Sequence, residues 1–208
     1  MSVATITALL FVVFLGVLGV TIWIDSKKTY ILPPKLNTQD GGDEASEENA
    51  SAEHKASTKN GDLIAKVSAN DKGTASSWAE LGYEYENTQS DDQKLVVELS
   101  FKYRLNLETS DNQSPVRAKV ETCLNSNPVT IKEQSLTAPP AQDEKAAPMT
   151  DKFETGSQRH IVVLKAGENF KATIKISLQA EAGEGGNCKG EIIANLSEIY
   201  YRPELRPM

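Results

Sequence analysis

The sequence predicts an all-β domain, an antiparallel β-sandwich, that follows a single N-terminal transmembrane helix. Three observations lead to this prediction. Residues 2–24 contain no charged side chain, residues 37–60 contain almost no large apolar side chain, and apolar residues alternate with polar ones along most of the remaining chain. We therefore divide the chain into a transmembrane anchor (1–25), a flexible acidic tether (26–61) and a β-sandwich domain (62–208).

The first segment has the length and composition of a single-pass membrane helix. At about 1.5 Å per residue, residues 3–24 would extend about 33 Å, which matches a hydrocarbon layer about 30 Å thick. Trp23 and Tyr30 lie at the far end, where amphipathic aromatic rings suit the membrane interface. No basic residue precedes the run and no small-residue cleavage site follows it. We therefore expect an uncleaved signal anchor.

The orientation of the domain rests on opposing signals. Lys27, Lys28 and Lys35 follow the apolar run, and the positive-inside rule would place them in the cytoplasm. The cysteine pair, the acidic tether and the β-rich domain are typical of extracytoplasmic proteins instead. We favour the extracytoplasmic side, in a periplasm or at a cell surface, over the cytoplasm.

The tether is predicted from composition. Pro33 and Pro34 prevent the membrane helix from continuing, and the residues that follow bury too little surface to offset chain entropy. Within the tether, Gly41-Gly42-Asp43-Glu44 resembles the start of a motif of diguanylate cyclases. Ala45 follows where those enzymes usually carry Phe, and no strand is expected on either side. We interpret the four residues as part of a solvated spacer.

The domain is predicted from residues that alternate with a period of two. In residues 95–107 the odd-numbered side chains are all apolar, whereas the even-numbered ones are mostly polar, as in a strand with one buried face. A strand of this length should bend or carry a bulge, and a second bulge is expected near Ser197. The other expected strands are 63–67, 81–85, 116–120, 129–136, 161–164, 170–178 and 190–201.

One-sided strands need a second sheet to cover their apolar face, which favours a two-sheet sandwich. Residues 160–178 resemble the late hairpin of immunoglobulin-like envelope domains, with a Gly-Glu turn between two strands. The resemblance implies an immunoglobulin-like fold and carries no activity. The alternative fold is an up-and-down β-barrel. Residues 138–159 are expected to form a long irregular loop, either a contact segment or a disordered insertion.

Cys123 and Cys188 are the two cysteines of the chain. Their spacing excludes a short-range thiolate metal site. Cys188 is in phase with the inward residues Ile192 and Ala194, whereas Cys123 is out of phase with the apolar residues of its strand. We expect a disulfide between them, with two unpaired thiols as the alternative.

No catalytic signature is present. The chain has two histidines, His54 in the tether and His160 at the start of a strand, and it lacks nucleophile-elbow, phosphate-loop and zinc-helix motifs. The net charge of −7 excludes a nucleic-acid binder. We predict no catalytic residue, no metal site and no cofactor, so the protein is not expected to be an enzyme.

These features predict a non-catalytic, membrane-anchored binding or assembly component of a cell-envelope complex, with other envelope or membrane proteins as partners. One alternative is a structural subunit of a filament or membrane supercomplex, because an apolar helix before a β-rich head is a pilin-like architecture. A carbohydrate- or lipid-binding module is a further alternative.

Overall fold

The computed structural model describes residues 36–46, 48–88, 90–125, 127–137 and 153–203. The predicted anchor, its interface residues Trp23 and Tyr30, and residues 138–152 of the expected loop lie outside these ranges. No helix among the described residues has the length and apolar character needed to cross a membrane.

The described residues form ten strands, and eight of these overlap the eight strands that the sequence predicts. In chain order the strands are β1 (Thr38–Ala45), β2 (Ala50–Ser57), β3 (Asp62–Asn70), β4 (Thr74–Glu86), β5 (Gln93–Thr109), β6 (Val116–Leu124), β7 (Asn127–Leu136), β8 (Glu154–Leu164), β9 (Asn169–Glu181) and β10 (Asn187–Pro203). Alternating side chains explain the central strands β3, β4, β6 and β9, in which one face is buried and the other is more exposed, whereas the edge strand β7 has no buried face.

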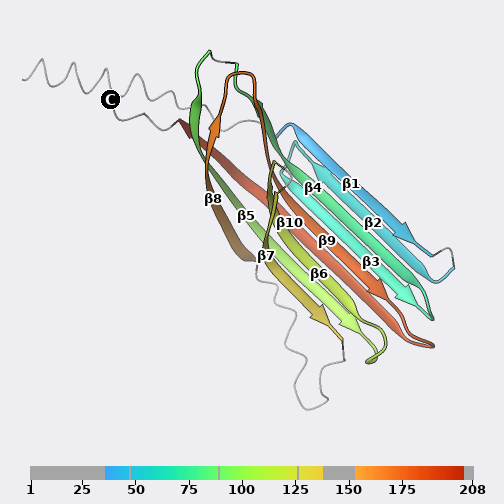
Figure 1. The fold of residues 1–208 in the computed structure, drawn as a ribbon. Coiled ribbons are helices and arrows are strands. Elements are labelled where there is room, and N and C mark those ends of the chain that lie inside the picture. Colours follow the sequence, from blue (N-terminus) through green and yellow to red (C-terminus); the bar gives the residue numbers. More distant parts are fainter. Residues whose placement is uncertain (1–35, 47, 89, 126, 138–152, 204–208) are drawn as a thin grey trace, which may run out of the picture.

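The strands form two five-stranded antiparallel sheets, which confirms the predicted sandwich (Figure 1). Sheet A has the order β1-β4-β9-β6-β7, and sheet B has the order β2-β3-β10-β5-β8. The chain passes repeatedly from one sheet to the other, as in a jelly roll, so the expected immunoglobulin-like arrangement is corrected. The two sheets are separate and each has edge strands, so the alternative of a closed barrel is excluded as well.

The core lies between the inner faces of the two sheets. In β9 the inward side chains are almost fully buried, and in β5 the inward residues Leu99 and Phe101 are fully buried. Burying one such side chain contributes about 1.5–3 kcal/mol to folding, so these inward faces hold the sandwich together. The inward residues of β9 are Phe170, Ala172, Ile174, Ile176, Leu178 and Ala180.

One of the two predicted bulges is observed. The β10 register shifts between Leu196 and Glu198, which confirms the expected bulge near Ser197. No bulge interrupts β5, whose pairing with β8 is unbroken. Gly167 has a φ of 77° in the turn between β8 and β9, which only glycine adopts without strain.

The tether prediction is corrected for the residues that the structure describes. β1 pairs with β4 and β2 pairs with β3, so residues 38–57 belong mostly to the sandwich. In β2 the inward positions are small residues such as Ala52 and Ala56. Strand pairing provides hydrogen-bond partners for the backbone N–H and C=O groups, and small side chains are enough to fill the space at the edge of the core. A prediction based on large apolar side chains cannot detect such strands.

The predicted disulfide is not formed, because both cysteines are free thiols. Cys188 is buried at one end of the sandwich, with its Sγ 3.7 Å from the carbonyl oxygen of Pro115. Cys123 lies eight residues further along β6, about 26 Å away at the usual strand rise. A disulfide needs Cα atoms within about 7 Å, so the fold keeps these thiols apart.

Candidate binding face on sheet A

The outer face of sheet A consists of side chains from four neighbouring strands that point away from the core. The register between β1, β4, β9 and β6 is unbroken, so these side chains align in rows across the strands. We call the following positions the polar face, row by row: Glu44, Ser76, Gln179 and Arg117; Gly42, Trp78, Ser177 and Lys119; Asp40, Glu80, Lys175 and Glu121; Thr38, Gly82, Thr173 and Cys123.

Trp78 is the aromatic residue of the polar face and stands in its second row. The neighbouring position on β1 is Gly42, and a Cβ there would lie 2.7 Å from Trp78 Nε1. The ammonium of Lys175 lies 4.4 Å from the ring centroid. Such a contact is worth about 0.5–1 kcal/mol at an exposed site, little enough for a ligand to displace it. The half-buried indole therefore offers apolar surface within a polar surrounding.

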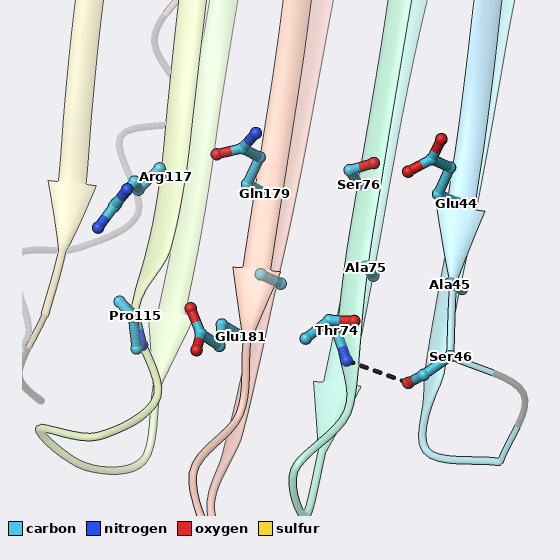
Figure 2. Close-up of a pocket in the computed structure, with 11 residues that line it drawn as sticks. Glu44, Ala45, Ser46, Thr74, Ala75, Ser76, Pro115, Arg117, Gln179 and Glu181 are labelled. Carbon is cyan, nitrogen blue, oxygen red and sulfur yellow. Dashed lines mark hydrogen bonds between the residues drawn. The ribbon is translucent and has the colours of Figure 1, made fainter.

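A groove of about 540 Å³ crosses the first row of the polar face. Figure 2 shows the side chains of this row projecting from four adjacent strands. Glu44, Gln179 and Arg117 form no side-chain hydrogen bond or ion pair with another residue that the structure describes. The groove therefore presents donors and acceptors whose bonding capacity is not used by the residues that the structure describes. Its lining residues are Glu44, Ala45, Ser46, Thr74, Ala75, Ser76, Pro115, Arg117, Gln179, Ala180 and Glu181.

A second pocket of about 280 Å³ lies toward the opposite end of the polar face. Lys171 Nζ lies 2.7 Å from Glu80 Oε1, so two of the lining charges form an ion pair. We call this site the Cys123 pocket. It is lined by Glu80, Glu121, Cys123, Pro128, Lys171, Thr173 and Lys175.

The thiol in this pocket stays protonated at neutral pH. Burial raises the pKa of the Cys123 thiol, and the carboxylates of Glu80 and Glu121 raise it further. A hydrogen bond with Thr173 and the charge of Lys175 oppose these effects, with smaller weight. Nucleophilic cysteines need a lowered pKa, so the Cys123 thiol is not activated for catalysis.

A polar cluster joins the edge strands β1 and β2 across the open side of the sandwich. His54 Nδ1 lies 2.6 Å from Asp43 Oδ2, and the Ser77 hydroxyl donates to Asp43 Oδ1 at 2.8 Å. The carboxylate stands between serine and histidine, so the serine does not donate to the histidine as it would in a hydrolase triad. This cluster is structural. A Cβ at Gly41 would overlap the His54 ring, which explains the first glycine of the motif.

The cluster corrects the interpretation of Gly41 to Glu44 as a solvated spacer. Gly41 accommodates His54, Gly42 accommodates Trp78, Asp43 joins the two sheets, and Glu44 lines the groove. His54, expected to be solvated in the tether, is half-buried in β2. In β1, inward and outward positions alternate as in any strand. This alternation cannot be recognised in the sequence, because the inward residues of β1 are not apolar.

The outer face of sheet B also carries a groove, of about 470 Å³, but its charges are mostly paired. Glu191 lies 3.1 Å from Lys66 and 3.9 Å from Arg104. Lys189 lies 2.8 Å from Glu108. Among the described residues, no cluster of three or more histidine, cysteine, aspartate or glutamate side chains is arranged to hold a metal ion.

Comparisons with known proteins find distant similarity in fold alone. No protein-family model matches the chain, and no curated protein matches it. A family 11 carbohydrate-binding module from Clostridium thermocellum, solved with a β-1,3-1,4-mixed-linked tetrasaccharide, has 12% identity and a TM-score of 0.28, covering 78% of this chain and 87% of that one. The module TmCBM61, solved with β-1,4-galactotriose, has 14% identity and a TM-score of 0.21, covering 76% and 90%. Eiger TNF from S. frugiperda has 12% identity and a TM-score of 0.20, covering 59% and 69%.

Proposed function

We propose that this protein is a non-catalytic, membrane-anchored binding module whose polar face holds an oligosaccharide outside the cytoplasm. The observation that carries the proposal is the set of aligned rows on sheet A, where a half-buried tryptophan lies beside polar side chains with unused hydrogen-bonding capacity. A sugar ring has the matching chemistry, with hydroxyl groups at its rim and an apolar face.

The shape of the face supports an extended ligand. The groove on the first row and the Cys123 pocket lie at opposite ends, with Trp78 between them. Successive rows lie two residues apart along each strand, so three steps span about 20 Å. A chain of several sugar units fits this length. The polar groups of the face lie on the outside of a sheet and do not enclose a reacting group, which supports binding without catalysis.

Binding to soluble polysaccharides tests the proposal. The full-length chain in detergent micelles is run on native affinity gels that contain mixed-linked β-glucan, β-1,4-galactan, or no polysaccharide. We expect retardation by at least one neutral polysaccharide. The retardation should be lost in Trp78→Ala and kept in Glu191→Gln, which alters the outer face of sheet B. Equal mobility in every gel, for a folded protein, would overturn the function.

A second candidate function, assembly with other membrane proteins, is favoured by the edge strand β8. Ile161 and Val163 are 58% and 59% exposed on the same side of this strand. Exposed aliphatic side chains on an edge strand suit contact with a partner protein. The double variant Ile161→Lys with Val163→Lys should then reduce the size of the native complex extracted from membranes. Ser157→Lys on the same face of β8 is the matched control, and an unchanged complex in the double variant would exclude this role.

A further inference from the structure

We propose that the Cys123 pocket is a subsite for one uncharged sugar ring, whose hydroxyl group bonds the buried hydroxyl of Thr173. The inference deepens the proposed function and rests on it. It names the place on the polar face that anchors the ligand, and it specifies the charge of the sugar that is bound there.

The first argument is an unused hydrogen-bonding group. Thr173 is 1% exposed, and its Oγ1 has no nitrogen or oxygen partner among the described residues. Its polar neighbour is the Cys123 thiol, which is a weak donor and a weak acceptor. Leaving a buried hydroxyl without a strong partner is unfavourable. A ligand hydroxyl that enters the pocket would recover this free energy.

The second argument is the charge balance of the pocket. Glu80 is paired with Lys171 at 2.7 Å, and Glu121 Oε1 lies 2.7 Å from Lys119 Nζ in a close ion pair whose angles do not make a hydrogen bond. Lys175 is engaged with Trp78. A charged ligand would have to break one of these pairs, whereas an uncharged ring can use them as they stand. A carboxylate oxygen can accept a hydrogen bond from one sugar hydroxyl, while a lysine donates a hydrogen bond to the adjacent hydroxyl of the same ring.

The third argument is size. The pocket measures about 280 Å³, close to the lower limit of small-molecule pockets and large enough for one sugar ring. Pro128 supplies an apolar wall on the β7 side. The same uncharged ring occurs in a polysaccharide chain and in a glycolipid headgroup, and the experiment below distinguishes these two sources.

Ligand protection of Cys123 tests the subsite directly. The full-length chain in detergent is treated with N-ethylmaleimide, and the modification of each cysteine is followed by peptide mass spectrometry. Three probes are compared: free D-galactose and D-glucose, the soluble β-glucan and β-galactan, and mixed micelles with monogalactosyl diacylglycerol. We expect at least one probe to slow Cys123 modification several-fold. Cys188, which is 2% exposed, serves as the internal reference.

A pair of threonine variants adds a matched control. Thr173→Val removes the hydroxyl of a residue that lines the pocket and should weaken binding of the protecting probe about tenfold. Thr122→Val removes a hydroxyl that is also buried and also lacks a hydrogen-bond partner among the described residues. Thr122 lies opposite the inward residue Ile174 in the register of β6 and β9, so it belongs to the inner face of the sheet and not to the pocket. The Thr122 variant should bind as the unmodified protein does.

The outcomes separate the subsite from the function. Retardation on polysaccharide gels without protection of Cys123, or equal effects of the two threonine variants, would overturn the subsite and leave the binding face intact. Neither retardation nor protection with any probe would overturn both. Protection by the glycolipid micelles alone would support the subsite and identify the lipid headgroup as its ligand.

Discussion

The outer faces of sheets A and B are both polar, but the fold uses their charges differently. On sheet B, Glu191 is shared between Lys66 and Arg104, so the charges satisfy one another. On sheet A, Glu44 and Arg117 border a groove without a side-chain partner among the described residues, and Trp78 stands beside them. Polar groups without a partner gain more from a ligand than paired ones, because they form new hydrogen bonds and do not have to share existing ones. This difference is the reason why we propose sheet A, and not sheet B, as the binding face.

The largest expected effect comes from Trp78, the aromatic residue in the rows of the polar face. Trp78→Ala should weaken oligosaccharide binding by about 30-fold, or about 2 kcal/mol, as expected for a central aromatic anchor. Isothermal titration with the polysaccharide that retards the protein measures this loss. Trp78→Phe keeps a ring and should retain part of the affinity. Full affinity in the alanine variant would remove the main distinction between the two faces.

A smaller loss of affinity is expected from a change at Gly42, which lies next to the Trp78 ring and has no side chain. Gly42→Ala places a Cβ 2.7 Å from Trp78 Nε1, so the indole must shift. We expect binding to weaken about five- to tenfold, because the ring leaves its position beside the neighbouring rows. The melting temperature, followed by circular dichroism, shows whether the sandwich stays folded. Unchanged affinity would indicate that the ring position does not matter for the ligand.

The pH dependence of Cys123 tests the environment at the far end of the polar face. Because burial and two carboxylates raise the pKa of this thiol, its thiolate fraction at pH 8 should be lower than that of an exposed cysteine. Modification by N-ethylmaleimide should therefore be slower than for a reference peptide at pH 8, with the gap closing as the pH rises through the raised pKa. A rate equal to that of the peptide at pH 8 would contradict the buried, acidic surrounding.

The smallest effect is expected on sheet B. Glu191→Gln removes the carboxylate that contacts Lys66 and Arg104, but surface ion pairs contribute only about 0–1 kcal/mol. The free energy of unfolding in urea should change within that range, and less at high salt. Oligosaccharide affinity should be unchanged. A marked loss of affinity would move the binding site to sheet B.

Much of the fold could be predicted because several strands alternate large apolar and polar side chains. In β5 and β9 the inward residues, such as Phe101 and Ile174, are large enough to mark the buried face in the sequence. β1 and β2 were missed, since residues such as Gly41 and Ala52 give no hydrophobic signal although they occupy inward positions. Their strands are defined by backbone pairing with β4 and β3, which no local pattern reports.

The candidate site was less predictable than the fold. The alternation places Cys123 off the buried face of its strand, as expected, but it does not show which outward residues share a surface. The predicted disulfide was wrong for the same reason. Knowing which face of its strand each cysteine occupies does not give the distance between Cys123 and Cys188 along the sandwich. Only the order of strands in sheet A places Trp78 next to the groove and Thr173 in the Cys123 pocket.

The sequence by itself determined the strands with large inward side chains, the bulge near Ser197 and the absence of known catalytic motifs, because these depend on residues close together in the chain. Only the tertiary structure decided that residues 38–57 form strands, that the cysteines are apart, and that rows from β1, β4, β9 and β6 make one face. Those features depend on strand pairing between distant segments, where backbone hydrogen bonds and register, rather than side-chain period, fix which residues meet.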